Sequence, residues 1–484
     1  MKKRIIALPI MISLLLLSCG EVPEEERVEK TDTVPEVIAP AETGESVETE
    51  PARRTLQDTV PELDFDGLDF RVLSQGSGEL YREELTGAVL NDAIYNRNQA
   101  IQNRFNVNIG MPTSMDYSEL ATQVRRIVRS GEDAYELVLG QMEESGKNAI
   151  EGNFQNWYDI PYMDFTKPWY PKSIMQEGIT TINGRMFIAE SDLNLGYAGQ
   201  TWVFVFDKVQ ADNYGIAGVY ETVRDGKWTI DKLMDWTGDI YNDVDGNGIR
   251  ENTDFYGLIY RGSGCCLTAH VYGMGLRTTE IQEGEIVFPL NSDKGSAVFE
   301  KIQGIFKNPG TLRYDDLMEG ELFCTGCAIF ANMRLSLCYS ALRDYENAYG
   351  IIPLPKWDEA QEEYYTIADA GCNILAVPIT TSNTELTGAI TEALSAESWR
   401  SVMPTYCDIC LGTKSARDPE SQEMIQVALE SRYIDFAYLY DGWTGWTFKL
   451  DVFIQKEGEF ASIFKTNERM VRKYYEKVAA KFYE

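Results

Sequence analysis

A regular alternation of strand-like and helix-like segments constrains the fold of this chain more than any other feature. The pattern of apolar residues predicts strands at residues 68–73, 107–109 and 135–139. The two segments between them carry apolar residues at helical spacing, namely Leu90, Ile94, Ile101 and Phe105 in the first and Leu120, Val124, Ile127 and Val128 in the second. Strands that alternate with helices indicate an α/β domain with a parallel sheet. Ligands of such domains bind at the carboxyl ends of the strands.

The N-terminus has the pattern of an export signal. Lys2, Lys3 and Arg4 precede an apolar run at residues 5–17, which is too short to span about 30 Å of hydrocarbon comfortably. The string LLSC at residues 16–19 resembles the bacterial lipobox, in which the cysteine is acylated and becomes the first residue of the mature protein. We therefore predict a lipoprotein signal peptide at residues 1–18 and a palmitate-type acyl anchor on Cys19, which would place the protein on the extracytoplasmic face of the cell membrane. The alternative is a plain signal peptide with an incidental cysteine.

Residues 19–61 are rich in Glu, Thr, Val, Pro and Ala and show no periodicity, which predicts a disordered acidic tether. The chain carries a net charge of −32, and its acidic residues are spread rather than clustered. Such a charge repels phosphate backbones, so nucleic-acid binding is not expected. About 420 residues follow the tether, more than one hydrophobic core usually holds, and we expect at least two lobes.

Eight short strings in this folded part are informative through their order and spacing. They are YELVLGQ at 135–141, WYDIPYMDFTKPWY at 157–170, NGRMFIA at 183–189, AGQTWVFVFDK at 198–208, DGKWT at 225–229, NAYGIIPLPK at 347–356, ARDPESQEM at 416–424 and YID at 433–435. Together, from about residue 66 to about residue 440, they resemble the extracellular solute-binding proteins of bacterial ABC importers, the carbohydrate-type family 1.

The resemblance implies a type II periplasmic-binding-protein-like fold, in which crossing strands join two α/β lobes and a hinge motion closes the ligand into the interlobe cleft. It places the N-lobe at residues 62–190 and 355–396 and the C-lobe at residues 191–354 and 397–484. The crossings are expected near residues 188–195, near residues 350–356 and after Ala396.

The function implied is that of a lipid-anchored substrate-binding protein that is not an enzyme, has the permease subunits of an ABC importer as partners, and captures a carbohydrate. An exported polysaccharide-active enzyme is the first alternative. A binding protein for a peptide or another non-sugar ligand is the second.

A sugar receptor stacks the C–H faces of its ligand on Trp or Tyr and binds the hydroxyl rim with polar side chains. Residues of these types near predicted strand ends or crossings are Gln75, Gln141, Asp192, Tyr197, Trp202, Asp369 and Asn373. Trp443 and Trp446 are further candidates, because Gly442 and Gly445 place them in a loop that is poorly suited to core packing. The alternative for both tryptophans is a place in the core.

The string DVDGNGIRENTD at residues 243–254 has the spacing of a calcium loop of the EF-hand or dockerin type. The oxygen ligands would be Asp243, Asp245, Asn247, the Ile249 carbonyl, Glu251 through water, and Asp254. Position 8 of the loop, usually apolar, is Arg250. We predict a structural Ca²⁺ site, and the alternative is an Asx-rich turn that binds no metal.

Histidine and cysteine limit the remaining chemistry. His270 is the only histidine, which argues against His-dependent hydrolases and multi-histidine zinc enzymes. Apart from Cys19 there are eight cysteines, which favours disulfides or buried thiols in an exported protein. The two C-x-x-C pairs, Cys324 with Cys327 and Cys407 with Cys410, could instead bind zinc.

Overall fold

The structure is a computed structural model that describes Arg53 and residues 55–76, 78–282, 285–314, 319–407, 418–441, 446–455 and 460–484. The predicted signal peptide, Cys19, most of the tether and Trp443 lie outside these residues. Among the described residues, no helix is long and apolar enough to cross a membrane.

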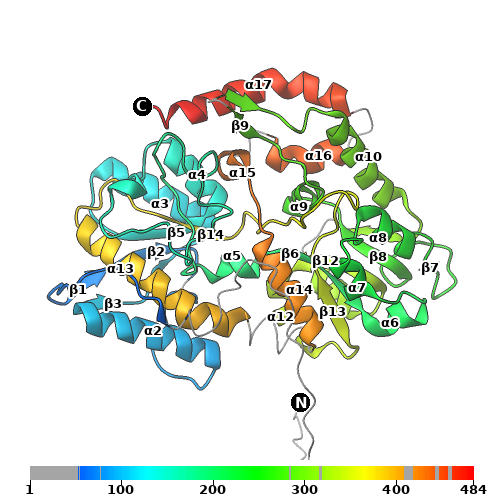
Figure 1. Ribbon diagram of the computed structural model, residues 1–484, viewed down its shortest axis with the longest axis horizontal. Helices are drawn as coiled ribbons and strands as arrows, with labels where there is room; N and C mark the ends of the chain where they lie inside the picture. Colours follow the sequence, from blue (N-terminus) through cyan, green and yellow to red (C-terminus); the bar gives the residue numbers. More distant parts are fainter. Residues whose placement is uncertain are drawn as a thin grey trace, which may run out of the picture. The chain divides into compact units, whose positions relative to one another are not determined.

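The N-lobe is built on a sheet in the order β14-β5-β2-β4. β2 (Val72–Ser74) runs parallel to β4 (Thr113–Ser114) and β5 (Leu137–Gln141), and β14 (Asn373–Ala376) is antiparallel to β5. The helices of this lobe are α2 (Val89–Phe105), α3 (Tyr117–Ser130), α4 (Met142–Ile150) and α13 (Thr384–Glu397) (Figure 1). The parallel α/β arrangement predicted from the sequence is confirmed.

The single strand predicted at residues 68–73 is two strands. β1 (Leu68–Phe70) pairs in parallel with β3 (Val107–Ile109), whereas β2 joins the larger sheet. Arg71 separates them, and its backbone N–H donates to the carboxylate of Glu136 at 2.6 Å rather than to a neighbouring strand. A side-chain acceptor therefore ends one strand and starts the next.

The C-lobe is built on a six-stranded sheet in the order β11-β8-β12-β6-β13, with β7 paired to β8. Its strands are β6 (Trp202–Asp207), β7 (Tyr241–Asn242), β8 (Phe255–Arg261), β11 (Thr311–Tyr314), β12 (Ala328–Arg334) and β13 (Tyr349–Ile352). β6 and β12 are almost wholly buried, because helices cover both faces of the sheet. These helices include α6 (Lys208–Asn213), α7 (Val219–Arg224), α8 (Ile230–Thr237), α9 (Cys265–Gly273), α10 (Asp293–Lys307), α11 (Glu319–Cys324) and α12 (Leu335–Ser340).

Within the described residues, three chain segments that connect the lobes lie side by side. The first contains α5 (Leu195–Gly199) and pairs antiparallel with the second through Ala189 with Leu375 and Thr201 with Ala368. The third pairs with the second in parallel through Thr366 and Arg432. Such narrow strand pairs are the kind of connection about which two lobes can rotate.

The second crossing lies later in the chain than the sequence predicted. Residues 349–352 form β13 of the C-lobe sheet, and Lys356 still pairs with Thr229 of that lobe. The chain therefore crosses at Thr366–Asn373. The apolar pattern of the YGII strand does not distinguish a strand of a lobe's sheet from a segment that crosses between the lobes, because either would be buried and extended.

The C-terminal helices contact both lobes. α15 (Phe436–Tyr440) packs on α4 of the N-lobe, where a Cβ on Gly146 would lie 2.0 Å from the Leu439 carbonyl oxygen. α16 (Leu450–Gln455) packs on α9 and α10 of the C-lobe. α17 (Phe460–Ala480) begins with the Phe460 ring stacked on Phe299, at a centroid distance of 3.9 Å, and also lies beside the hairpin of β9 (Glu280–Gln282) and β10 (Glu285–Val287).

The end of the chain returns to the N-lobe. The ring of Phe482 lies 5.2 Å from that of Phe187, and its carbonyl accepts a 3.1 Å hydrogen bond from Asn183 Nδ2. The C-terminal segment, α15 to Glu484, therefore bridges the two lobes (Figure 1).

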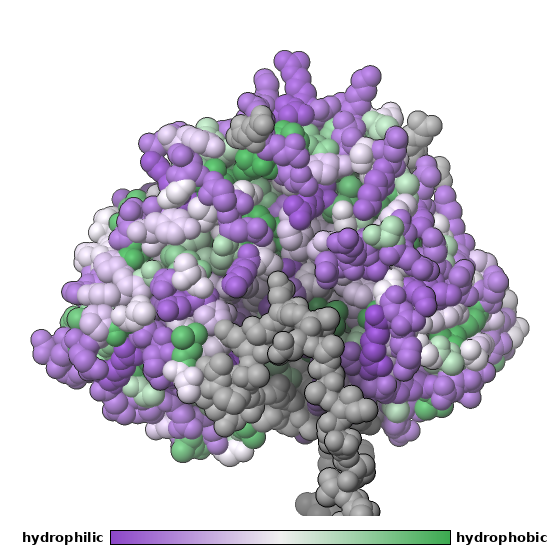
Figure 2. All heavy atoms as spheres, in the orientation of Figure 1, coloured by the Kyte–Doolittle hydropathy of each residue, from purple (hydrophilic) through white to green (hydrophobic). Residues whose placement is uncertain are grey.

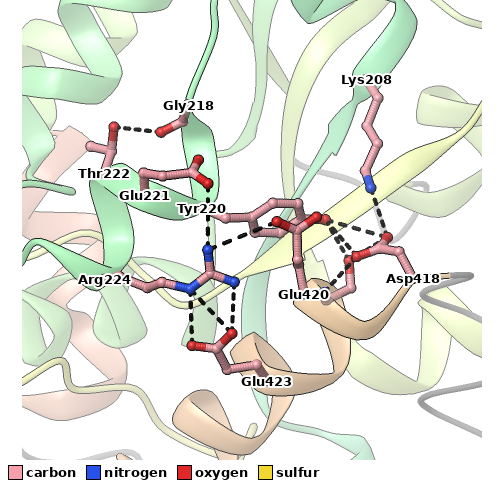
Figure 3. Close-up of polar contacts among 10 residues, drawn as sticks. Lys208, Gly218, Tyr220, Glu221, Thr222, Arg224, Asp418, Glu420 and Glu423 are labelled. Carbon is pink, nitrogen blue, oxygen red and sulfur yellow. Dashed lines mark hydrogen bonds and ion pairs between the residues drawn. The ribbon is translucent and has the colours of Figure 1, made fainter. Parts of the chain in front are cut away.

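The first part of the DPESQEM string caps and anchors a helix of the C-lobe. Asp418 caps α14 (Pro419–Glu430) by accepting the Ser421 N–H at 2.7 Å, and it pairs with Lys208 Nζ at 2.7 Å. Arg224 of α7 reaches Glu423 of α14 at 2.7 Å (Figure 3). These contacts hold α14 against α6 and α7.

The described surface in the view of Figure 2 is mainly hydrophilic, and its hydrophobic residues are scattered. Scattered exposed apolar side chains are normal for a globular protein and do not mark a docking surface.

Candidate functional site

Three of the predicted ligand residues meet at one edge of the N-lobe sheet. Gln75 follows β2, and its N–H donates to Leu139 O at 2.9 Å. Gln141 ends β5 and lies opposite Asn373, the first residue of β14. Asn373 Nδ2 donates to the Gln75 carbonyl at 3.3 Å. The carboxyl ends of two parallel strands and the start of their antiparallel neighbour thus present three amide side chains together.

Trp202 occupies the corresponding edge of the C-lobe sheet. It opens β6, lies opposite Arg334 at the end of β12, and is fully buried. The guanidinium groups of Arg261 and Arg334 lie 5.7 and 5.8 Å from the centroid of its ring. Its Nε1–H has no hydrogen-bond partner in the described part of the chain.

The second crossing segment connects the two edges. Trp202 N donates to Ile367 O at 3.1 Å, and Asp369 N donates to Gln200 O at 2.9 Å. The segment then continues directly into Asn373. The structure therefore brings Gln75, Gln141, Asn373, Trp202 and Asp369 into one region between the lobes.

Tyr197 and Asp192 lie on the first crossing segment. Tyr197 is buried, and the Arg432 guanidinium stacks 4.2 Å from its ring centroid. Asp192 lies beside Arg53 at 4.0 Å, and burial raises its pKa to about 6. None of the contacts described for Asp192 is to the three amides of the N-lobe edge, so this residue stands apart from them.

Trp446 is in the core. Its indole is fully buried and stacks on Phe464 at a centroid distance of 4.4 Å and an interplanar angle of 10°. Phe453 contacts it from α16 at 5.3 Å. A ring covered by two helices has no free face for a sugar in this conformation, and the structure corresponds to the core alternative. Glycines near a tryptophan favour a loop, but Phe453 of α16 and Phe464 of α17 pack on the Trp446 ring.

Two polar residues at the N-lobe edge are absent from the sequence prediction. Asn194 is fully buried and donates to Glu190 Oε2 at 3.0 Å and to Asn373 O at 2.5 Å. Glu79 lies beside Gly196, where an added Cβ would be 3.0 Å from its Oε1. Both residues lie in irregular segments, which have no periodicity in the sequence. They come together because the first crossing segment, with Asn194 and Gly196, passes along this edge of the sheet.

The loop at residues 243–254 brings three of the predicted calcium ligands close together. Carboxylate oxygens of Asp243, Asp245 and Asp254 all lie within 4.8 Å of one another. Asp243 accepts the N–H groups of Gly246 and Gly248, each at 2.8 Å. Three carboxylates this close repel one another, and a divalent cation between them would remove that repulsion.

The remaining predicted ligands line the same loop. Asn247 Oδ1 accepts the Ile249 N–H at 2.5 Å, and Asn247 Nδ2 donates to Glu251 at 3.0 Å. The unusual Arg250 lies over the Tyr241 and Tyr256 rings, with centroid distances of 4.5 and 5.3 Å. Its Nη2 donates to Pro309 O at 2.7 Å, so the position that is usually apolar anchors the loop to the start of β11.

Histidine and the cysteines have structural surroundings. His270 is buried, with Nδ1 2.8 Å from Cys266 O, and burial lowers its pKa to about 4. Cys265, Cys324, Cys327, Cys338 and Cys372 are free thiols. Cys327, Cys338 and Cys372 are buried, which corresponds to the buried-thiol alternative for these three. Cys410 lies outside the described residues.

A cavity of about 340 Å³ lies beside the crossing segments. Ser173, Tyr364, Tyr365, Arg432 and Tyr433 are among the residues that line it. None of the predicted ligand residues does, so the cavity is separate from the amide cluster.

The fold is shared with solved structures. A cyclo/maltodextrin-binding protein in complex with maltotetraose matches 85% of this chain and 97% of its own at 14% identity and a TM-score of 0.56. UgpB from Mycobacterium tuberculosis, in complex with glycerophosphocholine, matches 85% of this chain and 98% of its own at 14% identity and a TM-score of 0.55. A solute-binding protein from Agrobacterium radiobacter K84, in complex with ribitol, matches 85% and 99% at 14% identity and a TM-score of 0.54.

No family model matches the chain, and no curated protein matches its sequence. The structural matches cover nearly all of their own chains and include both lobes of this one. They confirm the predicted fold: the chain has the two-lobe α/β fold of the substrate-binding proteins of ABC transporters.

Proposed function

We propose that this protein is the substrate-binding component of an ABC importer, that it is not an enzyme, and that it captures a carbohydrate between its lobes. One observation carries the proposal. The crossing segment that pairs with Trp202 leads directly into Asn373, so it connects the amides of the N-lobe edge to an indole of the C-lobe edge, which is fully buried in this conformation and would become accessible if the lobes rotate apart. Side-chain amides and an indole are the groups that bind the hydroxyl rim and the C–H face of a sugar.

Calorimetric titration of the purified protein with neutral and charged oligosaccharides and with short peptides tests this. A binding isotherm with an oligosaccharide that chromatography recovers intact supports the proposal. Turnover of the oligosaccharide that persists through purification would favour the exported enzyme instead. An isotherm with peptides alone would make this a receptor for another ligand class.

The membrane anchor is part of the proposal. An acyl chain on Cys19 would hold the protein at the extracytoplasmic face of the cell membrane, near the permease subunits that receive the ligand. Cys19→Ser should move the protein from the membrane fraction to the soluble fraction and abolish incorporation of labelled palmitate. Unchanged membrane association of this variant would contradict the anchor.

We further propose that the loop at residues 243–254 binds a structural Ca²⁺. A cation that binds only the folded state stabilises it by RT ln(1 + [Ca²⁺]/Kd), so chelation should lower the melting temperature. Asp243→Ala combined with Asp245→Ala should abolish this calcium dependence and leave ligand affinity unchanged. Asp235→Ala removes an exposed carboxylate elsewhere and serves as the control. If the chelator leaves the melting temperature of the wild type unchanged, the loop is only a turn.

A further inference from the structure

Two buried amides at the N-lobe edge use their nitrogens and leave their oxygens unpaired. Asn194 Nδ2 donates to Glu190 Oε2 at 3.0 Å and to Asn373 O at 2.5 Å. Asn373 Nδ2 donates to Gln75 O at 3.3 Å. Among the described residues, neither Asn194 Oδ1 nor Asn373 Oδ1 has a partner. Because both nitrogens have acceptors, the two side-chain oxygens are the atoms that remain without a partner in the described part of the chain.

A carboxylate stands beside these oxygens. A side chain on Gly196 would lie 3.0 Å from Glu79 Oε1 and 3.1 Å from Asn194 Oδ1, so the absence of a side chain there lets the two groups approach each other. Glu79 Oε2 is buried and has no partner in the described part of the chain. Burial raises the pKa of Glu79, while hydrogen bonds from the Gly196 and Leu195 amides and the charge of Arg97 oppose the rise.

These three oxygens are all acceptors, and a buried acceptor without a donor costs free energy. A hydroxyl group of a ligand supplies the missing donor. A carboxylate or phosphate of a ligand would instead add further acceptors and place negative charge beside Glu79.

We propose that Asn194, Asn373 and Glu79 form an acceptor wall that determines specificity, and that the ligand class is uncharged and polyhydroxylated, with uronates and phosphorylated sugars excluded. This inference rests on the proposed sugar-binding function and assigns roles to two residues, Asn194 and Glu79, that the sequence did not indicate. A preference for acidic sugars would also have a structural cause, because the guanidinium groups of Arg261 and Arg334 lie over Trp202 at the C-lobe edge. The experiment therefore compares the wall with these arginines.

The test is calorimetry with matched pairs of oligosaccharides that differ only in the oxidation state of C6, such as oligogalactosides against oligogalacturonides. We expect the neutral member of a binding pair to bind at least tenfold more tightly. Glu79→Gln replaces one acceptor of the wall with a donor of the same shape and should reduce that preference at least fivefold. Glu132→Gln changes an exposed carboxylate far from the site and should leave the preference unchanged.

Gly196→Ala provides a second route to the same wall. Its methyl group would press on Glu79 Oε1 and Asn194 Oδ1 together and should weaken binding of the neutral sugar at least fivefold. Gly304→Ala adds a methyl group whose nearest neighbour, Met234 Cε, is 3.9 Å away, and should not change binding. Melting temperatures measured alongside separate a loss of binding from a loss of folding.

Tighter binding of the acidic member would refute the acceptor wall. It would indicate instead that Arg261 and Arg334 determine the charge preference of the site. An equal preference for the neutral oligosaccharide in Glu79→Gln and in the wild type would also refute the acceptor wall. It would leave the proposed sugar-binding function standing. Absence of binding by every sugar of either kind would refute the function and the wall together.

Discussion

Gly146 in α4 is expected to be the most sensitive glycine in the contact between the N-lobe and the C-terminal segment. A Cβ at this position would lie 2.0 Å from the Leu439 carbonyl oxygen of α15. Carbon and carbonyl oxygen approach to about 3.3 Å without strain, so Gly146→Ala must move α15 away from α4 by more than about 1 Å.

The expected magnitude combines two opposing effects. Alanine improves helix propensity by about 1 kcal/mol. Overpacking of a close backbone contact costs about 1–3 kcal/mol, and part of the α15 interface is lost as well. We therefore expect Gly146→Ala to lower the free energy of unfolding by about 1–2 kcal/mol, as measured by urea denaturation.

Gly304→Ala is the matched control, because it places the same methyl group inside α10, 3.9 Å from its nearest neighbour. It should raise the free energy of unfolding by about 0.5–1 kcal/mol. If Gly146→Ala stabilises the protein as much as Gly304→Ala does, α15 does not pack on α4 at this distance, and the bridge between the lobes is described incorrectly.

Three further predictions concern the packing of single groups. Trp446→Ala should lower the free energy of unfolding by about 3–5 kcal/mol and leave the affinity of the folded fraction for the proposed sugar ligand unchanged, as calorimetry on the same sample can show. Asp418→Ala removes the cap of α14 and should cost about 1–2 kcal/mol, whereas Arg224→Ala breaks an exposed ion pair and should cost less than about 1 kcal/mol in the same urea assay. Burial raises the pKa of Glu392 from 4.5 to about 7, so this group keeps its proton in the folded protein while the unfolded chain loses it. Its contribution to stability is therefore present below pH 4.5 and is lost as the pH rises to about 7, and the stability of Glu392→Gln relative to wild type should rise over that interval.

The strand ends were the part of the site that the sequence could predict. Gln75 and Gln141 follow strands whose apolar pattern is plain, and the parallel arrangement places their ends at one edge. Asn194 and Glu79 could not be found this way, because they lie in irregular segments. Asn194 reaches Asn373 through the pairing of the first and second crossing segments, whereas Glu79 follows β2 and meets Gly196 of the first crossing segment.

Tertiary context also explains the remaining differences. The local sequence around Trp446 contains glycines and gives no sign of the phenylalanines of α16 and α17 that enclose the ring. The YGII strand could belong to either lobe by its pattern, and its pairing with β6 assigns it to the C-lobe. Burial periodicity indicates that a residue is inside, but not which distant element covers it.

The bridge formed by the C-terminal segment has a consequence for the order in which the molecule is assembled. The ring of Phe482 meets that of Phe187, and its carbonyl accepts from Asn183, 299 residues earlier. Synthesis proceeds from the N-terminus, so Asn183 and Phe187 cannot make these contacts until the C-lobe and the crossing segments have been synthesised. Contacts of such long sequence separation slow folding. Replacement of Phe482 by alanine would remove the ring contact that joins the C-terminal segment to Phe187 of the N-lobe.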